Sequence, residues 1–450
     1  MHSLVPLVLV WCSALQDKPA PAPTPAPAPV QDPKPPEKPP GMQGDDVFRT
    51  LAKRLTFGGQ VRIRAEYRDP TSYTNTPASR RDVDLFMERV RLNFKVDVTD
   101  DIEVFIQPQD QRIWGEEASV LTDTKNMDLH QGFVEVRNLL SEPLTVKAGR
   151  FEMAYGDQRL VSPLDWSNIA RAWDGVKVKY GPPKEWWVEG FYTFIRDGVS
   201  ASQDSDFYGL YSSYVGVEAH EFDAYVFGRS FRNDAAATGL TGEVGDLRDT
   251  TAGARIKGKD FGFDYTAEVM RQWGRFNTSM IQAYAYAATL GYTFPCDWAP
   301  RIMVEYTYAS GDRDPAHATR NTFDPLFPFA HYYQGYADFF GFKNGKDLAV
   351  YTKISPTKEF SIHLDFHNFW LSQSRDAWYN DPGNQIRRDV TGSAGRKLGY
   401  ETDFHLRWAA SKYVNFWGGW SHVFAGPYIR QTPGPDQDMD WFFLQMTVNF

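Results

Sequence analysis

In two short stretches near the beginning of the chain, basic side chains occupy most of one alternating set of positions. The stretches cover residues 57–69 and 86–99, and their bases are Arg62, Arg64, Arg68, Arg89, Arg91 and Lys95. Rings of Arg or Lys are how anion pores select their ions. At an effective dielectric of about 20, one guanidinium near a carboxylate contributes a few kcal/mol. These residues therefore predict a track of cationic side chains that replace the hydration shell of a passing anion.

The same bases have acidic neighbours, and this leaves a second interpretation open. Glu66, Glu88, Asp97 and Glu103 lie in or beside the two stretches. If each base pairs with one of these acids, the result is a ladder of ion pairs that braces a wall and binds no solute.

A second group of charged residues lies in 147–177, where Arg and Asp recur among glycine, proline and aromatic residues. Gly156 and Pro163 interrupt regular structure, so we expect a loop folded into a channel. An Arg that pairs with an Asp still has donors left for a ligand. The alternative is that these pairs only hold the loop to the wall.

Strands must position these side chains, and the C-terminal residues show the strand pattern most clearly. Apolar and polar residues alternate there, and the apolar ones are Phe442, Leu444, Met446, Val448 and Phe450. A period of two puts the two sets on opposite faces of a β-strand. About eighteen such segments follow one another from 57–69 to 440–450, each near the length that crosses a membrane in a tilted barrel.

Short and long connections alternate between these segments. The long ones are 70–85, 113–126, 152–172, 233–248, 311–346, 372–397 and 425–439. This favours an all-β fold, a transmembrane antiparallel β-barrel with short periplasmic turns and long extracellular loops. A soluble sandwich has no reason to segregate its loops by length. A charge facing lipid at mid-depth costs about 2–4 kcal/mol, so the bases belong in the lumen.

Composition agrees with a barrel. Aromatic residues make up 15% of the chain, yet the mean hydropathy is −0.48. No mature stretch approaches the roughly 18 to 20 consecutive apolar residues of a spanning helix. The net charge of −9 argues against nucleic-acid binding. With Cys12 in a leader, Cys296 is the one remaining thiol, and no intramolecular disulfide is expected.

The N-terminal residues divide into two further segments. Residues 1–16 are typical of a secretory signal peptide, although no base precedes the apolar run. Residues 17–46 are rich in Pro and Ala and predict an extended periplasmic linker. The barrel then covers 47–450. Contact of the linker with the cell wall is the functional alternative to an inert tether.

Several stretches resemble one family of outer-membrane porins, the alginate-export family. They are QPQDQRIWGEE (107–117), DLHQGFVEVRNL (128–139), KAGRFEMAYGDQRLVSPLDWSNIARAWDGVKV (147–178) and the segment 309–348 with its DPLFP and YQGYAD elements. The resemblance covers essentially all of 57–450 and is weaker in 200–300. It implies an 18-stranded monomeric barrel, and the best-known member passes alginate through an Arg-lined constriction. The N-terminal tract departs from the family pattern, so the transported polymer could differ from alginate.

The resemblance also implies site residues. The matching positions are Arg150, Tyr155, Gly156, Asp157, Arg159, Asp165, Trp166, Asn168, Arg171, Asp174 and Gly175. The charged and amide residues of this set, together with Arg112 and the bases of the first two strands, are the predicted pore lining.

The connection 311–346 is far longer than hairpin closure needs, and its composition is too apolar for a solvated coil. We therefore expect it to pack on the inner wall near its own strands and to gate the outer mouth. The predicted gating residues are Phe323, Phe327, Tyr332, Tyr333 and Tyr336. The alternative is a loop folded outward on its neighbours.

Taken together, these features predict a porin of the bacterial outer membrane that passes an acidic polysaccharide or oligosaccharide by passive diffusion. The alternatives are a general nutrient or organic-acid porin and a structural barrel tethered to the cell wall. No Ser/His/Asp order or paired-carboxylate motif stands out, so we expect no enzyme, cofactor or metal. The expected partners are the anionic saccharide, outer-membrane lipid and, through Phe450, the assembly machinery that reads a terminal aromatic residue.

Overall fold

The computed structural model describes residues 53–116, 127–196, 204–238, 244–314, 318–381 and 383–450. The predicted signal peptide and the whole of the predicted linker lie outside these residues. In the described part of the chain, no helix is long and apolar enough to cross a membrane.

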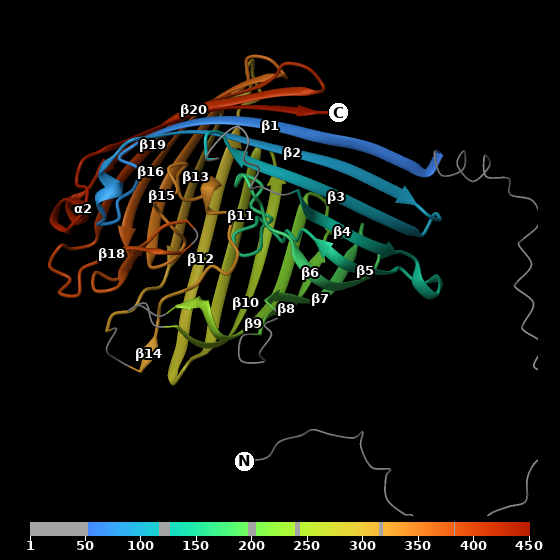
Figure 1. Ribbon diagram of the computed structural model, residues 1–450, viewed down its shortest axis with the longest axis horizontal. Coiled ribbons are helices and arrows are strands. Elements are labelled where there is room, and N and C mark those ends of the chain that lie inside the picture. The colour runs from blue at the N-terminus through green and yellow to red at the C-terminus, as the bar shows by residue number, and fades with distance from the viewer. Residues whose placement is uncertain (1–52, 117–126, 197–203, 239–243, 315–317, 382) are drawn as a thin grey trace, which may run out of the picture. The chain divides into compact units, whose positions relative to one another are not determined.

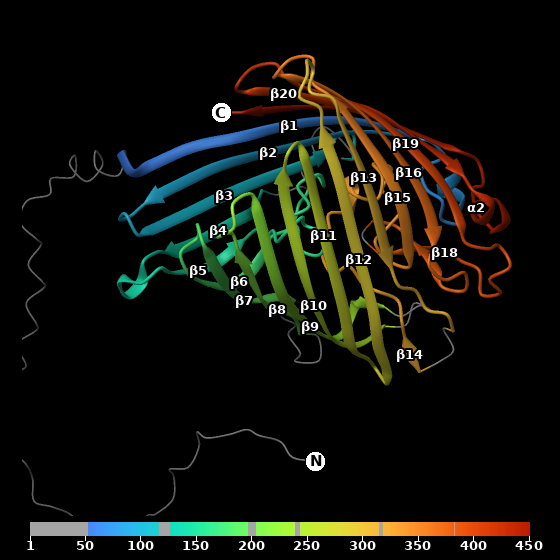
Figure 2. The ribbon, with the colours of Figure 1, turned by 180° about the vertical axis from the view of Figure 1, so that it is seen from behind.

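Eighteen strands of the described residues close into one antiparallel barrel, as the sequence predicted (Figure 1). They are β1 (Leu55–Asp69), β2 (Val83–Asp97), β3 (Ile102–Ile113), β4 (Asp128–Val136), β5 (Leu144–Phe151), β6 (Trp173–Tyr180), β7 (Trp186–Arg196), β8 (Ser205–Tyr214), β9 (His220–Thr238), β10 (Val244–Asp260), β11 (Phe263–Phe276), β12 (Ser279–Thr293), β13 (Arg301–Ala309), β15 (Gly345–Ile354), β16 (Phe360–Leu371), β19 (Lys397–Ala409), β20 (Val414–Ala425) and β21 (Met439–Asn449). Each pairs with the next, and β21 pairs back onto β1. From behind, β9 to β12 stand side by side (Figure 2).

Smaller elements lie in the connections. The two-residue β14 (Thr319–Arg320) adds to β12, while β17 (Ala377–Tyr379) and β18 (Gln385–Arg388) form a separate hairpin. The short helices are η1 (Pro77–Arg80), η2 (Leu139–Ser141), η3 (Ala330–Tyr332) and α2 (Pro427–Gln431).

The last strand shows how the sequence alternation becomes two faces. Phe442 and Leu444 are 46% and 61% exposed, while Trp441 and Phe443, which alternate with them, are buried. Exposed apolar side chains on one face and buried side chains on the other are what a barrel wall between lipid and a filled lumen requires. Phe450 closes the ring, since its amide donates to the Gly59 carbonyl at 3.0 Å and its carbonyl accepts from the Gly59 amide at 2.8 Å.

The connections segregate largely as predicted, with one correction. Residues 98–101, 261–262 and 410–413 are tight turns at the end where the described barrel begins and finishes. The predicted long connection 233–248 is wrong, because β9 runs to Thr238 and β10 begins at Val244. The Asn-Asp-Ala-Ala-Ala-Thr run of 233–238 has no apolar alternation to reveal the strand.

The topology predicts where a protease reaches the protein on whole cells. Val390, in the connection 372–396, is 66% exposed. We expect external proteinase K to cut near Val390 and to leave residues 17–46 intact until the outer membrane is permeabilised. Fragment masses from intact and permeabilised cells provide the measurement. Cleavage of 17–46 on intact cells would overturn the orientation.

Candidate functional site

The connection between β5 and β6, residues 152–172, is the inward loop, and two arginines of the barrel wall hold its backbone. Arg62 of β1 donates to the carbonyl oxygens of Asp165 at 2.6 Å and Ser167 at 2.8 Å. Arg89, which lies opposite Arg62 on β2, reaches the same two oxygens at 3.1 and 3.3 Å. Like charges placed opposite each other repel, and the shared carbonyl oxygens offset this repulsion.

Two further arginines of the same strands complete this clamp. Arg64 donates to the Trp166 carbonyl at 2.7 Å, and its guanidinium lies 4.0 Å from the centre of the Trp166 ring. Arg91 donates to Asp165 Oδ1 at 3.0 Å. Asp165 also accepts from Arg89 at 2.8 Å, and its side chain is 56% exposed. The wall therefore presents four buried guanidinium groups to a loop segment whose one carboxylate remains open to the lumen.

The remaining predicted residues of the inward loop also bind distant parts of the barrel. Arg159 pairs with Glu305 of β13 at 2.5 Å, both side chains being buried, and lies 3.9 Å from the Tyr333 ring centre. Asp157 accepts from Arg255 of β10 at 3.2 Å. Asn168 donates to the Glu88 carbonyl at 3.0 Å. The loop is thus fixed from three sides.

Arg171 is the exception among the charged residues of this loop, because its hydrogen bonds go to backbone oxygens. It donates to the carbonyls of Pro328 at 2.8 Å and Ser162 at 3.4 Å. Burial lowers the pKa of Arg171 to about 10, and the charge of Asp381 opposes this shift. The positive charge of Arg171 is therefore available to an anion in the cavity that it lines.

Two predicted bases of the first strands lie apart from the clamp. Arg68 places its guanidinium 5.5 Å from the Trp441 ring centre and 5.3 Å from that of Phe339. Lys95 pairs with Asp97 and Glu103, each at 3.3 Å, near the end of β2. Both side chains lie on the same face of their strands as the four arginines of the clamp, the face toward the lumen.

Three predicted pore-lining residues face outward, which corrects the sequence prediction. Arg112 lies opposite Glu88 and pairs with Asp110 at 2.7 Å, whereas the inward positions of β3 are Gln109 and Gln111. Arg150 and Asp174 pair with each other at 2.7 Å on the face opposite the buried Phe151 and Trp173. All three lie at strand ends, where a charge facing outward costs only about 0–1 kcal/mol near the membrane interface.

The connection between β13 and β15, residues 310–344, is the aromatic loop, and its part after β14 lies against the inward loop. The amide of Phe327 donates to the Leu160 carbonyl at 2.8 Å, and the amide of Ser162 donates to the Phe327 carbonyl at 3.0 Å. The His331 ring stacks on Trp166 with their centres 4.1 Å apart. The aromatic loop therefore packs on the inward loop as well as on the wall.

The predicted gating residues lie deeper and farther from their own strands than expected. Phe323 and Tyr336 are buried, while Phe327, Tyr332 and Tyr333 are half-buried. Tyr336 contacts Trp417 of β20 and Phe443 of β21, with ring centres 5.8 and 6.5 Å apart. The expectation that the loop packs near its own strands is thus incomplete, because it also reaches β20 and β21, three and four strands along the wall from β15.

Two cavities of about 190 and 310 Å³ adjoin Tyr332 of the aromatic loop. Both are also lined by Lys353 and Arg407. The Arg407 guanidinium lies 4.3 Å from the Trp417 ring centre, and its hydrogen bond to the Tyr336 hydroxyl is 3.4 Å long. In the described part of the chain, no carboxylate lies within 4.0 Å of Lys353 or Arg407. We call Tyr332, Lys353, Arg407 and Trp417 the lower site.

The sequence prediction missed Lys353 and Arg407, although their signal was present. Each base alternates with apolar residues of its strand, Arg407 between Leu406 and Trp408 and Lys353 before Ile354. This is the period of two that identified Arg62 and Arg89. Each is a single base in its segment, however, and the prediction followed clusters of bases.

A comparison with known protein families shows to which family the chain belongs. The sequence model of the family described as "Alginate export" matches residues 53–443. The chain belongs to the alginate export family. A search of curated proteins found no match.

Three solved structures of Pseudomonas aeruginosa proteins share the fold of this alginate-export family member. OpdO is 13% identical with a TM-score of 0.59, and the match covers 90% of this chain and 99% of that one. OccK11 (OpdR) is 11% identical with a TM-score of 0.56, covering 88% and 96%. The outer membrane protein OprD is 10% identical with a TM-score of 0.56, covering 88% and 94%. At these identities the match shows the fold, and with the family it indicates an outer-membrane channel.

Proposed function

We propose that this alginate-export family member passes an acidic saccharide by passive diffusion, with the lower site as a point of contact in its lumen. The observation that carries the proposal is the pair of basic side chains Lys353 and Arg407 beside the rings of Tyr332 and Trp417. A uronate residue has a carboxylate and an apolar ring face, and these four side chains supply a partner for each.

Electrostatics favours an anion at this position. Among the residues that the structure describes, the Nε of Arg407 is buried and has no hydrogen-bond partner. An arginine offers planar, bidentate geometry to a carboxylate. A carboxylate in the cavities that Arg407 lines would therefore pair with its guanidinium without displacing a carboxylate of the described residues.

The aromatic rings favour a sugar over a simple inorganic anion. The rings of Tyr332 and Trp417 are nearly parallel, with centres 6.2 Å apart and an angle of 13° between their planes. Together they present broad apolar surface next to the two cations, and aromatic side chains bury a large area at low entropic cost. Passage of the solute through the site, without chemical change, is the role that we assign.

A porin for small organic acids is the second candidate, and the size of the cavities favours it. The two cavities of the lower site measure about 190 and 310 Å³, which lie below and at the lower end of the roughly 300–1,000 Å³ of ligand sites. Release of labelled oligouronates of increasing length from liposomes separates the candidates. Passage of dimers but not of longer chains would favour the organic-acid porin.

We predict that the double substitution Lys353→Gln/Arg407→Gln lowers the anion preference of the channel. Two unpaired positive charges leave the lumen, so the reversal potential in a salt gradient should shift toward cations. The shift should be large at low salt and shrink near 1 M, where the Debye length falls to about 3 Å.

Lys412→Gln is the matched control for this prediction. Lys412 lies in the turn 410–413, with its ammonium 4.6 Å from the Tyr413 ring centre, so a charge is removed outside the lumen. An unchanged reversal potential in the double variant, or an equal shift in the control, would contradict the lower site as a selectivity element.

A further inference from the structure

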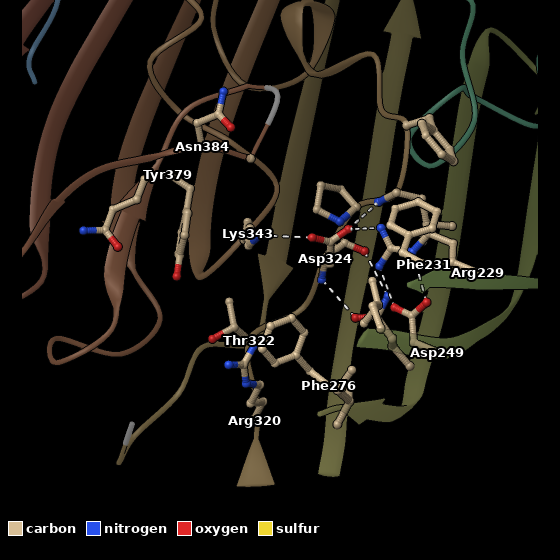
Figure 3. A pocket seen from close by; sticks show the side chains of 18 of the residues that line it. Arg229, Phe231, Asp249, Phe276, Arg320, Thr322, Asp324, Lys343, Tyr379 and Asn384 are labelled. Carbon is tan, nitrogen blue, oxygen red and sulfur yellow. Dashed lines mark hydrogen bonds and ion pairs between the residues drawn. The ribbon is translucent and has the colours of Figure 1, made fainter. Parts of the chain in front are cut away.

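A separate cavity of about 380 Å³ lies between the wall strands β9 to β12 and three connections, the inward loop, the aromatic loop and residues 372–396. Figure 3 shows Lys343 and Arg229 approaching Asp324 from opposite sides. Arg229 belongs to β9, whereas Asp324 and Lys343 belong to the aromatic loop. The cavity lies at the ends of the wall strands that carry the long connections, so it faces the extracellular side.

Asp324 holds a position that suits the carboxylate of a ligand. Arg229 Nη1 donates to Asp324 Oδ1 at 2.6 Å, and Lys343 Nζ donates to Asp324 Oδ2 at 3.0 Å. Burial raises the pKa of Asp324, but the charges of Arg229 and Lys343 outweigh it and hold that pKa well below its usual range. The side chain is therefore an anion bound between two cations.

The backbone of Asp324 is anchored independently of its side chain. The Asp324 amide donates to Gln272 Oε1 at 3.0 Å, and Gln272 Nε2 donates to the Asp324 carbonyl at 3.1 Å. The Oδ1 of Asp324 also accepts from the Leu326 amide at 3.1 Å. The side-chain carboxylate can thus leave the two cations by rotation, with the loss of that one bond, while the loop stays on the wall. Because Arg229 keeps a second carboxylate, Asp249, at 3.0 and 2.5 Å, it remains in place when Asp324 turns away.

The rest of the lining fits a sugar that carries a negative charge. Its charged side chains are four basic and two acidic ones, Arg171, Arg229, Arg320, Lys343, Asp249 and Asp324. Aromatic surface lies next to these charges, because Lys343 is 4.8 Å from the Tyr379 ring centre and Arg320 is 3.7 Å from that of Phe276. The volume lies in the range of about 300–1,000 Å³ typical of ligand sites.

We propose that this cavity is a second saccharide site, on the extracellular side, which binds one acidic sugar residue by exchanging its carboxylate for that of Asp324. The exchange keeps the salt bridges to Arg229 and Lys343, since one carboxylate replaces another. The ring of the sugar packs against Tyr379 and Phe276. This inference rests on the proposed function for the class of its ligand, but it concerns a different set of residues.

Removal of the competing carboxylate tests the exchange. In the Lys353→Gln/Arg407→Gln background, which lacks the cations of the lower site, we expect Asp324→Asn to bind digalacturonate about tenfold more tightly. Tenfold corresponds to about 1.4 kcal/mol, close to the lower end of the range for one charge-assisted hydrogen bond. Isothermal titration calorimetry of the full chain in detergent micelles gives the affinities.

Lys343→Gln in the same background is the opposing variant, and it should weaken digalacturonate binding at least about fivefold because one of the two cations is lost. Neutral cellobiose is the matched ligand and should gain nothing from Asp324→Asn. An unchanged digalacturonate affinity in either variant, or an equal gain for cellobiose, would overturn the second site. A failure of the selectivity prediction at Lys353 and Arg407 would leave these affinities unaffected, so the two proposals fail separately.

Discussion

Deletion of residues 318–340 should raise the single-channel conductance several-fold, because these residues fill much of the lumen. Within this segment Phe323 is buried against the wall cluster of β8 to β12, and Tyr336 reaches Trp417 on β20. Conductance grows with the open cross-section of a pore. Single-channel recording of the deletion variant in planar bilayers measures the effect.

The deletion is compatible with a folded barrel. β13 and β15, which the aromatic loop connects, are neighbours that pair from Arg301 with Lys353 to Tyr308 with Lys346. Their ends are therefore already close, and the residues that remain can close the hairpin.

A deletion of 390–393 provides the control for this experiment. Val390 is 66% exposed and the segment forms a turn capped by Asp389, so its loss should leave conductance near that of the wild type. Equal conductance of a folded 318–340 deletion and the wild type would show that the aromatic loop does not occlude the pore.

Much of the barrel could be predicted from the sequence because its wall separates two solvents. Lipid excludes charge from one face of each strand, so Arg62 and Arg89 had to face inward, and their burial confirms this. The alternation of charged and apolar residues is less informative at the strand ends, where lipid no longer excludes charge. Arg150 and Asp174 lie at strand ends near the interface, where a charge is tolerated on either face, and the sequence could not assign them.

The loops inside the barrel were harder to predict because their partners are distant in the chain. The segment 147–177 was expected to enter the channel, and its Gly156 and Pro163 supported that expectation. No local pattern shows that Arg62 binds the carbonyl of Asp165, 103 positions away. The same holds for the aromatic loop, whose apolar residues required a surface without specifying which one.

Loss of Arg159 should be the most destabilising single substitution among the predicted site residues. Arg159 on the inward loop and Glu305 on β13 form an ion pair whose side chains are 2% and 0% exposed. Arg159→Met leaves the buried Glu305 carboxylate without its partner, and breaking a buried pair in this way costs about 3–5 kcal/mol. Chemical unfolding of the refolded barrel in micelles, followed by tryptophan fluorescence, measures the loss.

The double variant Arg159→Met/Glu305→Leu separates the cost of the unpaired charge from the loss of packing. Arg159 also lies 3.9 Å from the Tyr333 ring centre, and Met preserves much of that contact. Because replacement of a buried ion pair by apolar residues of similar volume is often neutral or stabilising, we expect the double variant to regain most of the stability that Arg159→Met loses. If the double variant is as unstable as the single one, the stabilisation comes from packing of the arginine on Tyr333, and the ion pair itself contributes little to holding the inward loop on the wall.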